Sequence, residues 1–225
     1  LTRIATSAPQ RAHELTGASL FSVAGNATYQ NAYTLFILPY SLIAVSVSTA
    51  MFPKISRSIA AANLDEARHD LVSALNNVGL LIIFFAAAMV VFPEPIIRAL
   101  LPSVSLDETM LISYALIALS VGTPLGSAFL LIQRTFYAFE DGLHPFLSAV
   151  MQYGFTSIFM IIGMMVLPPE HWVLGIACSE TLGGLLALPL TLMMLRRKFE
   201  GNLGGREITR TYAKAIVAAP VSYTH

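Results

Sequence analysis

The sequence predicts an all-α protein, a polytopic bundle of transmembrane helices, and three observations support this fold class. Charged residues make up 12% of the 225 residues, about half of the fraction in soluble domains, and the mean hydropathy is +0.69. The stretch between Glu14 and Lys54 holds 39 residues without a formal charge, and later gaps hold 23, 25 and 28. A helix of about 20 apolar residues crosses the hydrocarbon layer, so each gap is long enough to span a membrane.

Five spans are predicted from these neutral windows, in the order in which they occur. They cover residues 29–52, 71–92, 109–133, 146–167 and 172–195. Asn63 and Ser105 precede the second and third spans and are each followed three residues later by a glutamate, a pattern typical of a capping box at a helix start. Pro39 and Pro124 fall inside spans and are expected to kink or break them.

The two ends of the sequence are interpreted as pieces of longer elements. Residues 1–28 are predicted to be the end of a truncated helix followed by an outer loop. Residues 196–212 are predicted to form a cytoplasmic loop, and residues 213–225 to begin a further transmembrane helix that is also truncated. We therefore expect a fragment of a longer protein.

The basic residues predict the orientation of the bundle. Ten of the thirteen lysines and arginines fall in the segments after the first, third and fifth spans, whereas Arg11 and Arg98 occupy the alternate segments. Cytoplasmic loops carry an excess of lysine and arginine. The first span is thus predicted to run from outside to inside, and the segment after the fifth span to be cytoplasmic.

Composition and motifs argue against several classes of function. The net charge is zero, so no basic field indicates a nucleic-acid partner. A single cysteine, Cys178, allows no internal disulfide or CxxC metal site, and the five histidines are scattered. No HExxH, GxSxG or P-loop sequence occurs. We therefore expect no enzyme, no catalytic residue, no metal and no cofactor.

Glu180 is the one formal charge inside the five predicted spans. A carboxylate at the centre of a membrane helix costs about 2.5–3.5 kcal/mol on insertion scales, so it normally faces a cavity or a partner. Two interpretations stay open. Glu180 is either a proton or cation relay or a substrate contact, or it is a protonated or hydrogen-bonded residue that holds helices together.

Other polar residues at membrane depth are candidates for a substrate cavity. Asn31 and Thr34 lie on a polar face of the first span, which suits either a water-filled cavity or hydrogen bonding between helices. Arg3 is a candidate anion site or a side chain that reaches the outer interface. The spans contain no lysine or arginine, so a strongly anionic headgroup would need its main cationic site upstream of Leu1.

Two stretches carry a family likeness. Residues 38–56, LPYSLIAVSVSTAMFPKIS, and residues 134–145, RTFYAFEDGLHP, resemble motifs of the MurJ/MviN lipid II flippase family, in the multidrug/oligosaccharidyl-lipid/polysaccharide exporter superfamily. The resemblance implies the second lobe of a two-lobe, fourteen-helix transporter, incomplete here, with the five spans as its eighth to twelfth helices. It implies a multi-pass protein of the bacterial cytoplasmic membrane.

The resemblance also implies a function and partners. The family moves undecaprenyl-diphosphate-linked muropeptide across the membrane by alternating access for peptidoglycan synthesis. Its partners would be this lipid-linked substrate, membrane lipids and cell-wall synthesis proteins. The alternatives are another flippase or a cation-coupled drug exporter of the same superfamily, and, from a different class, an intramembrane enzyme acting on lipid-linked sugars.

Several residues match the family motifs and are expected to have a structural or gating role. They are Pro39, Pro53, Arg134, Tyr137, Asp141 and Pro145. One departure stands out: the acid and arginine that the family often carries shortly before the proline fall on Tyr33 and Thr34. Contact of this lobe with a diphosphate is thereby put in doubt.

Overall fold

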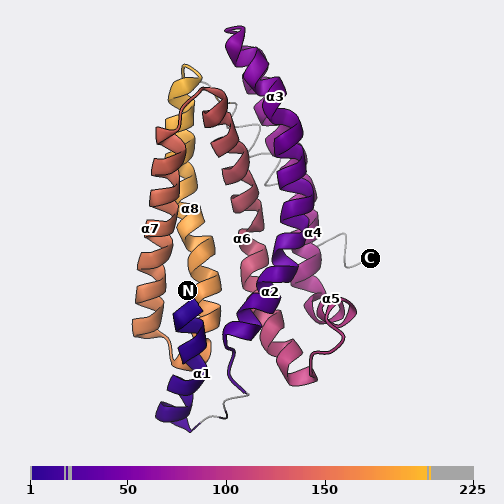
Figure 1. Ribbon diagram of the computed structural model, residues 1–225, viewed down its shortest axis with the longest axis vertical. Coiled ribbons are helices and arrows are strands. Elements are labelled where there is room, and N and C mark those ends of the chain that lie inside the picture. The colour runs from indigo at the N-terminus through magenta and orange to yellow at the C-terminus, as the bar shows by residue number, and fades with distance from the viewer. Residues whose placement is uncertain (1, 18, 20–21, 202, 204–225) are drawn as a thin grey trace.

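The computed structural model describes residues 2–17, 19, 22–201 and 203, and these residues form helices and connecting turns without a β-strand (Figure 1). The predicted all-α class is confirmed. The elements are α1 (Thr2–Thr16), α2 (Asn26–Pro39), the π-helical turn η1 (Tyr40–Val45), α3 (Ser46–Ala60), α4 (Leu64–Val91), α5 (Pro93–Leu100), α6 (Leu106–Ala138), α7 (Leu143–Val166), the 3-10 turn η2 (Pro169–His171) and α8 (Trp172–Lys198).

Five helices in the described part of the chain are long and apolar enough to cross a membrane. The first is continuous from Asn26 to Ala60 through η1, and it extends past the predicted end at residue 52. Helix α6 likewise extends three residues before and five after its predicted window of 109–133. The windows counted only neutral residues, whereas the helices continue through their charged ends into the aqueous layers.

Pro39 and Pro124, the two prolines expected to kink or break their spans, leave them unbroken. Pro124 lies within the uninterrupted α6. Pro39 is followed by the six-residue π-helical turn η1, after which α3 continues the same span. A proline removes one backbone donor and crowds the preceding turn, and a wider turn is one way to accommodate that crowding. The expected break is therefore replaced by a local widening.

The ends of α4 and α6 confirm the capping predicted from the sequence. The Asn63 side chain accepts a hydrogen bond from the Glu66 backbone N–H at 3.2 Å, and its amide donates to the Glu66 carboxylate at 2.9 Å. The Ser105 hydroxyl accepts from the Glu108 backbone N–H at 3.3 Å. These bonds satisfy donors that a helix start leaves unpaired.

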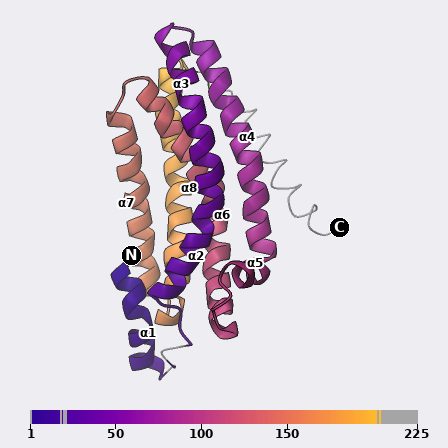
Figure 2. The same ribbon diagram turned by 45° about the vertical axis from the view of Figure 1, so that its right-hand side comes forward.

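The helices form a bundle around α6, which contacts α2, α3, α4, α7 and α8 (Figures 1 and 2). Glycines permit the closest approaches. Gly183 of α8 lies directly against Thr156 of α7, and a Cβ at Gly122 of α6 would lie 2.6 Å from the Thr181 hydroxyl of α8. Small residues allow membrane helices to pack backbone against backbone, and these two glycines let α8 approach both α7 and α6 closely.

Two apolar clusters hold the ends of the bundle. One joins Ile55, Ala67 and Leu195 near the α3–α4 turn and the C-terminal end of α8, and the other joins Ile97 and Ile176 near α5 and η2. The α3–α4 turn, the α6–α7 loop and the end of α8 lie at the same end of the bundle, uppermost in Figure 1. The predicted helix at 213–225 and most of the predicted loop at 196–212 lie outside the described residues.

Candidate functional site

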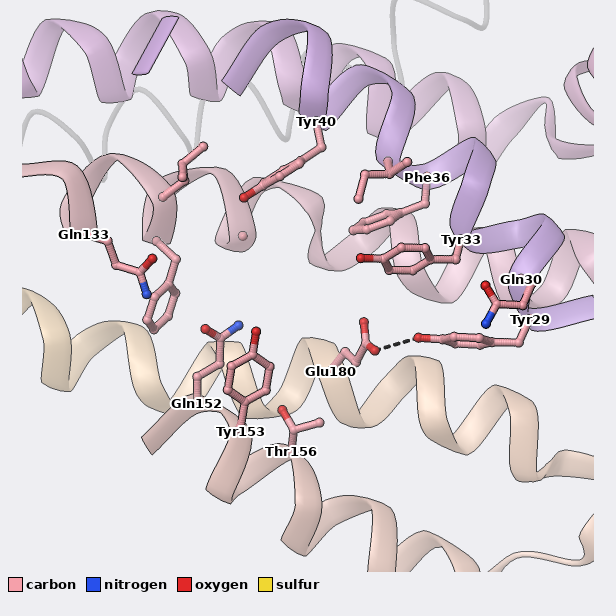
Figure 3. A pocket seen from close by; sticks show the side chains of 14 residues that line it. Tyr29, Gln30, Tyr33, Phe36, Tyr40, Gln133, Gln152, Tyr153, Thr156 and Glu180 are labelled. Atoms are coloured by element: carbon pink, nitrogen blue, oxygen red, sulfur yellow. Dashed lines mark hydrogen bonds between the residues drawn. The ribbon is translucent and has the colours of Figure 1, made fainter. Parts of the chain in front are cut away.

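A cavity of about 480 Å³ lies between α2, η1, α6, α7 and α8 and is partly open to the surface of the bundle, where Tyr153 is 68% exposed (Figure 3). Its walls combine aromatic rings with neutral polar groups. The lining residues are Tyr29, Gln30, Tyr33, Phe36 and Ile37 of α2; Tyr40 of η1; Gly126, Phe129, Leu130 and Gln133 of α6; Gln152, Tyr153 and Thr156 of α7; and Glu180 of α8.

Helical periodicity produces the aromatic side of the cavity. Tyr29, Tyr33, Phe36 and Tyr40 are spaced by four, three and four residues, a spacing that places side chains on one face of a helix. The rings of Tyr29 and Tyr33 stack with centroids 6.1 Å apart, and Tyr33 and Phe36 are 5.5 Å apart in a tilted arrangement. The result is an aromatic ladder along α2 (Figure 3).

Glu180 joins this ladder to α8. The Tyr29 hydroxyl donates a hydrogen bond to the Glu180 Oε1 at 2.6 Å. Tyr29 is buried, and Glu180 also lines the cavity. Both sequence interpretations of Glu180 thus have a structural counterpart: it links two helices, and it presents a carboxylate to an internal space.

The opposite wall belongs mainly to α7. Tyr153 directs its hydroxyl toward the space between Glu180 and Tyr40, and Gln152 lies beside it (Figure 3). Gln133 contributes a second amide from α6. Among the described residues lining the cavity, Glu180 is the one formal charge, and none is a lysine or arginine.

Three of the four residues predicted for a substrate cavity do not line it. Thr34 is exposed, and its hydroxyl donates to the Gln30 carbonyl at 2.8 Å. Asn31 is half-buried, and Arg3 is exposed on α1. Their roles in substrate binding stay predictions. The tyrosines and glutamines of the cavity were not predicted from the sequence, although the spacing of the aromatic residues between Tyr29 and Tyr40 indicates a shared helix face.

Asp141 organises the loop between α6 and α7. Its Oδ1 accepts hydrogen bonds from the backbone N–H groups of Leu143 and His144, each at 3.1 Å. Its Oδ2 lies 2.7 Å from Lys198 Nζ of α8 and 2.6 Å from His144 Nδ1. The side chain is 10% exposed. Burial alone would raise the pKa of Asp141, but the bonds from Lys198 and His144 outweigh it and hold the pKa well below its usual range.

The other motif residues occupy varied positions. Pro39 and Pro145 are buried, whereas Pro53 and Arg134 are exposed. Tyr137 is half-exposed, and the neighbouring Phe136 stacks on the His144 ring with centroids 5.3 Å apart. Their structural or gating role stays a prediction.

A second ion pair, not predicted from the sequence, joins α3 and α4. Lys54 Nζ lies 2.6 Å from Asp70 Oδ1, and the Asp70 side chain is only 4% exposed. The second Asp70 oxygen is buried without a hydrogen-bond partner among the described residues. This pair lies near the same end of the bundle as Asp141 and fastens the α3–α4 hairpin.

Five helices that are long and apolar enough to cross a membrane, four of which line a cavity with polar and aromatic side chains, define a multi-pass membrane protein. The family model described as "Lipid II flippase MurJ" matches residues 12–224. The chain therefore belongs to the MurJ family of lipid II flippases.

Individual relatives agree with this assignment. The chain is 26% identical to the lipid II flippase MurJ of Thermosipho africanus (strain TCF52B) over 169 residues, covering 74% of this chain and 34% of the relative. It is 28% identical over 155 residues to a Rhizobium meliloti (strain 1021) protein described as "Probable lipid II flippase MurJ", covering 67% of this chain and 28% of that relative. The chain thus spans about a third of the length of these relatives.

The fold also matches a solved structure. The structure titled "Lipid II flippase MurJ, inward closed conformation" superposes with a TM-score of 0.75 at 22% identity, over 99% of this chain and 45% of that one. The chain therefore shares its helical arrangement with nearly half of that structure.

Proposed function

We propose that this chain is the second-lobe part of a lipid II flippase, which moves undecaprenyl-diphosphate-linked muropeptide across the bacterial cytoplasmic membrane. The observation that carries the proposal is the family match over residues 12–224, together with a polar cavity inside an otherwise apolar bundle. Transport needs no covalent step, so we propose a carrier and not an enzyme.

The residues of the cavity support binding of different parts of the substrate by different parts of the whole transporter. A diphosphate is bound best by arginine or lysine, and the described cavity residues include neither. This lobe would therefore contact the uncharged and cationic parts of the substrate through tyrosine, glutamine and Glu180. The anionic part would bind to residues outside this chain.

Two ion pairs support a gating role for the motif residues. Both lie at the end of the bundle that holds the α3–α4 turn and the α6–α7 loop. Asp141 ties the α6–α7 loop to Lys198 at the end of α8, and Lys54 ties α3 to Asp70 of α4. Interfaces of this kind hold one arrangement until a competing one replaces it. We propose that these contacts stabilise one of the two states needed for alternating access.

Depletion of the full-length protein tests the flippase function. Lipid II should accumulate in the inner leaflet of depleted cells, and re-expression of the wild-type protein should restore its normal distribution. A leaflet distribution that does not change on depletion would contradict the proposal.

Cysteine labelling tests the orientation of the spans. In a Cys178→Ser background, Arg57→Cys and Arg197→Cys should resist a membrane-impermeant thiol reagent added outside, because both lie at the basic end of the bundle. Ser103→Cys, in the turn between α5 and α6, should react. The opposite pattern would show that the bundle is inverted.

A further inference from the structure

We propose that the cavity binds an organic ammonium group, held by the Glu180 carboxylate and the ring faces of Tyr33 and Tyr153. This inference rests on the proposed function only in naming which part of the transported ligand enters this lobe. The ammonium-binding chemistry itself follows from the charge, donors and aromatic surface of the cavity.

The described residues that line the cavity include one acidic side chain, Glu180, and no lysine or arginine. Glu180 lies within a membrane-spanning helix, where an ionised residue normally pairs with a cation or faces a water-filled space. Tyr29 is its one hydrogen-bond donor among the described side chains, and this neutral donor supplies no positive charge. The described lining residues offer no lysine or arginine to balance it. A cationic ligand would supply the missing charge.

Aromatic rings near Glu180 offer a second means of binding a cation. A cation within about 6 Å of the centre of a tyrosine ring gains roughly 0.5–2 kcal/mol, most when it is desolvated. Tyr33 lies between Tyr29 and Phe36 in the aromatic ladder. Tyr153 stands on the opposite wall, and both Tyr33 and Tyr153 flank the space in front of Glu180 (Figure 3). An ammonium group in that space would meet a carboxylate and aromatic surface together.

The donor set favours an organic ammonium over a divalent metal ion. Hard cations such as Ca²⁺ take six to eight oxygen ligands, several of them carboxylates. This cavity offers a single carboxylate, and no group of three acidic, histidine or cysteine side chains suited to a metal occurs in the described part of the chain. A cavity of about 480 Å³ also has room for the alkyl chain that carries the ammonium.

Two sources could supply such a group. One is a side-chain amine on the peptide of a lipid-linked muropeptide, and the other is a free organic cation. In the first case the two charged ends of one ligand separate within the transporter, with the amine in this lobe and the diphosphate elsewhere. The experiment below distinguishes the two sources.

The transport test uses the full-length protein in proteoliposomes. The substrates are a lipid-linked muropeptide with a free side-chain amine and the same lipid with that amine acetylated. We expect the wild-type protein to prefer the free amine by roughly tenfold, because the Glu180 carboxylate and a cation–aromatic contact of about 0.5–1 kcal/mol at the exposed Tyr153 ring both favour it. Glu180→Gln should remove most of that preference by slowing only the free-amine substrate. An equal slowing of both substrates would overturn the inference.

A binding test decides the inference independently of transport. N-acetyl-lysine methyl ester and its neutral analogue N-acetyl-norleucine methyl ester are titrated calorimetrically into the purified full-length protein. Only the amine should bind, and Glu180→Gln should weaken its binding about tenfold. If neither lipid is transported but the amine binds, the flippase proposal fails while the ammonium site stands, with a free cation as its ligand. If the amine binds no better than its analogue, the ammonium site is refuted.

A second variant protects both tests against loss of folding. Tyr153→Leu leaves the hydrogen bond between Tyr29 and Glu180 intact but removes one ring face from the cavity. It should reduce the preference for the amine severalfold at unchanged affinity for the neutral analogue. If Glu180→Gln does not fold, an unaltered preference in Tyr153→Leu overturns the inference.

Discussion

Gly183 is the tightest point between α7 and α8, and its replacement by alanine gives a direct test of how the helices pack. A Cβ at this position would meet the Thr156 side-chain hydroxyl, and it would lie 2.7 Å from the Thr156 backbone nitrogen and 2.9 Å from its Cα. A side chain can rotate away, but these backbone atoms belong to the interior of α7. The two helices must therefore move apart.

The expected cost follows from two opposing effects. Overpacking of a well-packed interface costs typically about 1–3 kcal/mol, whereas glycine to alanine within a helix gains up to about 1 kcal/mol in propensity. The backbone clash places Gly183→Ala toward the upper part of the packing range. We expect a net loss of about 1–2 kcal/mol in the free energy of unfolding.

Gly154→Ala provides the matched control. Gly154 lies on α7 itself, and a Cβ there would meet no atom within 4 Å, so only the propensity gain of up to about 1 kcal/mol applies. Thermal unfolding in detergent, followed by circular dichroism, should show a lower Tm for Gly183→Ala and an equal or higher Tm for Gly154→Ala. The packing described here is wrong if both substitutions raise the Tm alike.

Two further predictions concern the ion pairs of Asp141 and Asp70, at the end of the bundle that holds the α3–α4 turn and the α6–α7 loop. Asp141→Asn should destabilise the protein by about 1–2 kcal/mol at neutral pH. Because folding depresses the pKa of Asp141, the wild-type advantage is full above the unfolded value near 4 and is lost as the pH falls through the lower folded value. Unfolding measured from pH 7 downward should therefore show the two proteins converging below about pH 4, and a gap that persists in acid would contradict the assignment. Lys54→Met should cost about 1–3 kcal/mol, below the usual range for breaking a buried pair, because Lys54 is 51% exposed and partly screened. The double variant Lys54→Met/Asp70→Leu should recover most of that loss in the same unfolding assay, whereas no recovery would mean that Asp70 is not the group left unpaired.

The sequence contained most of the fold because insertion into lipid is decided locally. A window without charges either is or is not long enough to cross the hydrocarbon layer, and capping residues such as Asn63 and Ser105 mark helix starts from their own neighbours. These features require no knowledge of which helices meet. The fold class could therefore be read from composition and spacing alone.

The cavity could not be read in the same way because it depends on which faces of distant helices meet. Glu180 was identified since a single charge in a span is conspicuous. Tyr29 and Tyr153 were not, because tyrosine suits an apolar span, an interface or a cavity equally well. Thr34 attracted attention as a polar residue, yet its hydroxyl is satisfied within its own helix.

The ion pairs could not be predicted from the sequence for a related reason. Asp70 marked the edge of a neutral window in the sequence, and nothing local showed that it would be buried. Its partner Lys54 lies 16 residues earlier, across a helical hairpin whose exact register only the packed structure fixes. Asp141, by contrast, was found through its motif, although Lys198 as its partner was not.

The widened turn after Pro39 has a consequence for how one span serves two neighbours. Side chains before it, such as Tyr29 and Tyr33, face the cavity, while Val47 and Met51 beyond it pack on the cluster that includes α4. Each residue of a regular helix advances the azimuth by about 100°. Removing one residue from the range 41–45 would therefore rotate the whole of α3 by that angle relative to the aromatic ladder, which ends at Tyr40. The turn η1 thus sets the rotation of α3 about the helix axis relative to α2, so that the two halves of one span face different neighbours.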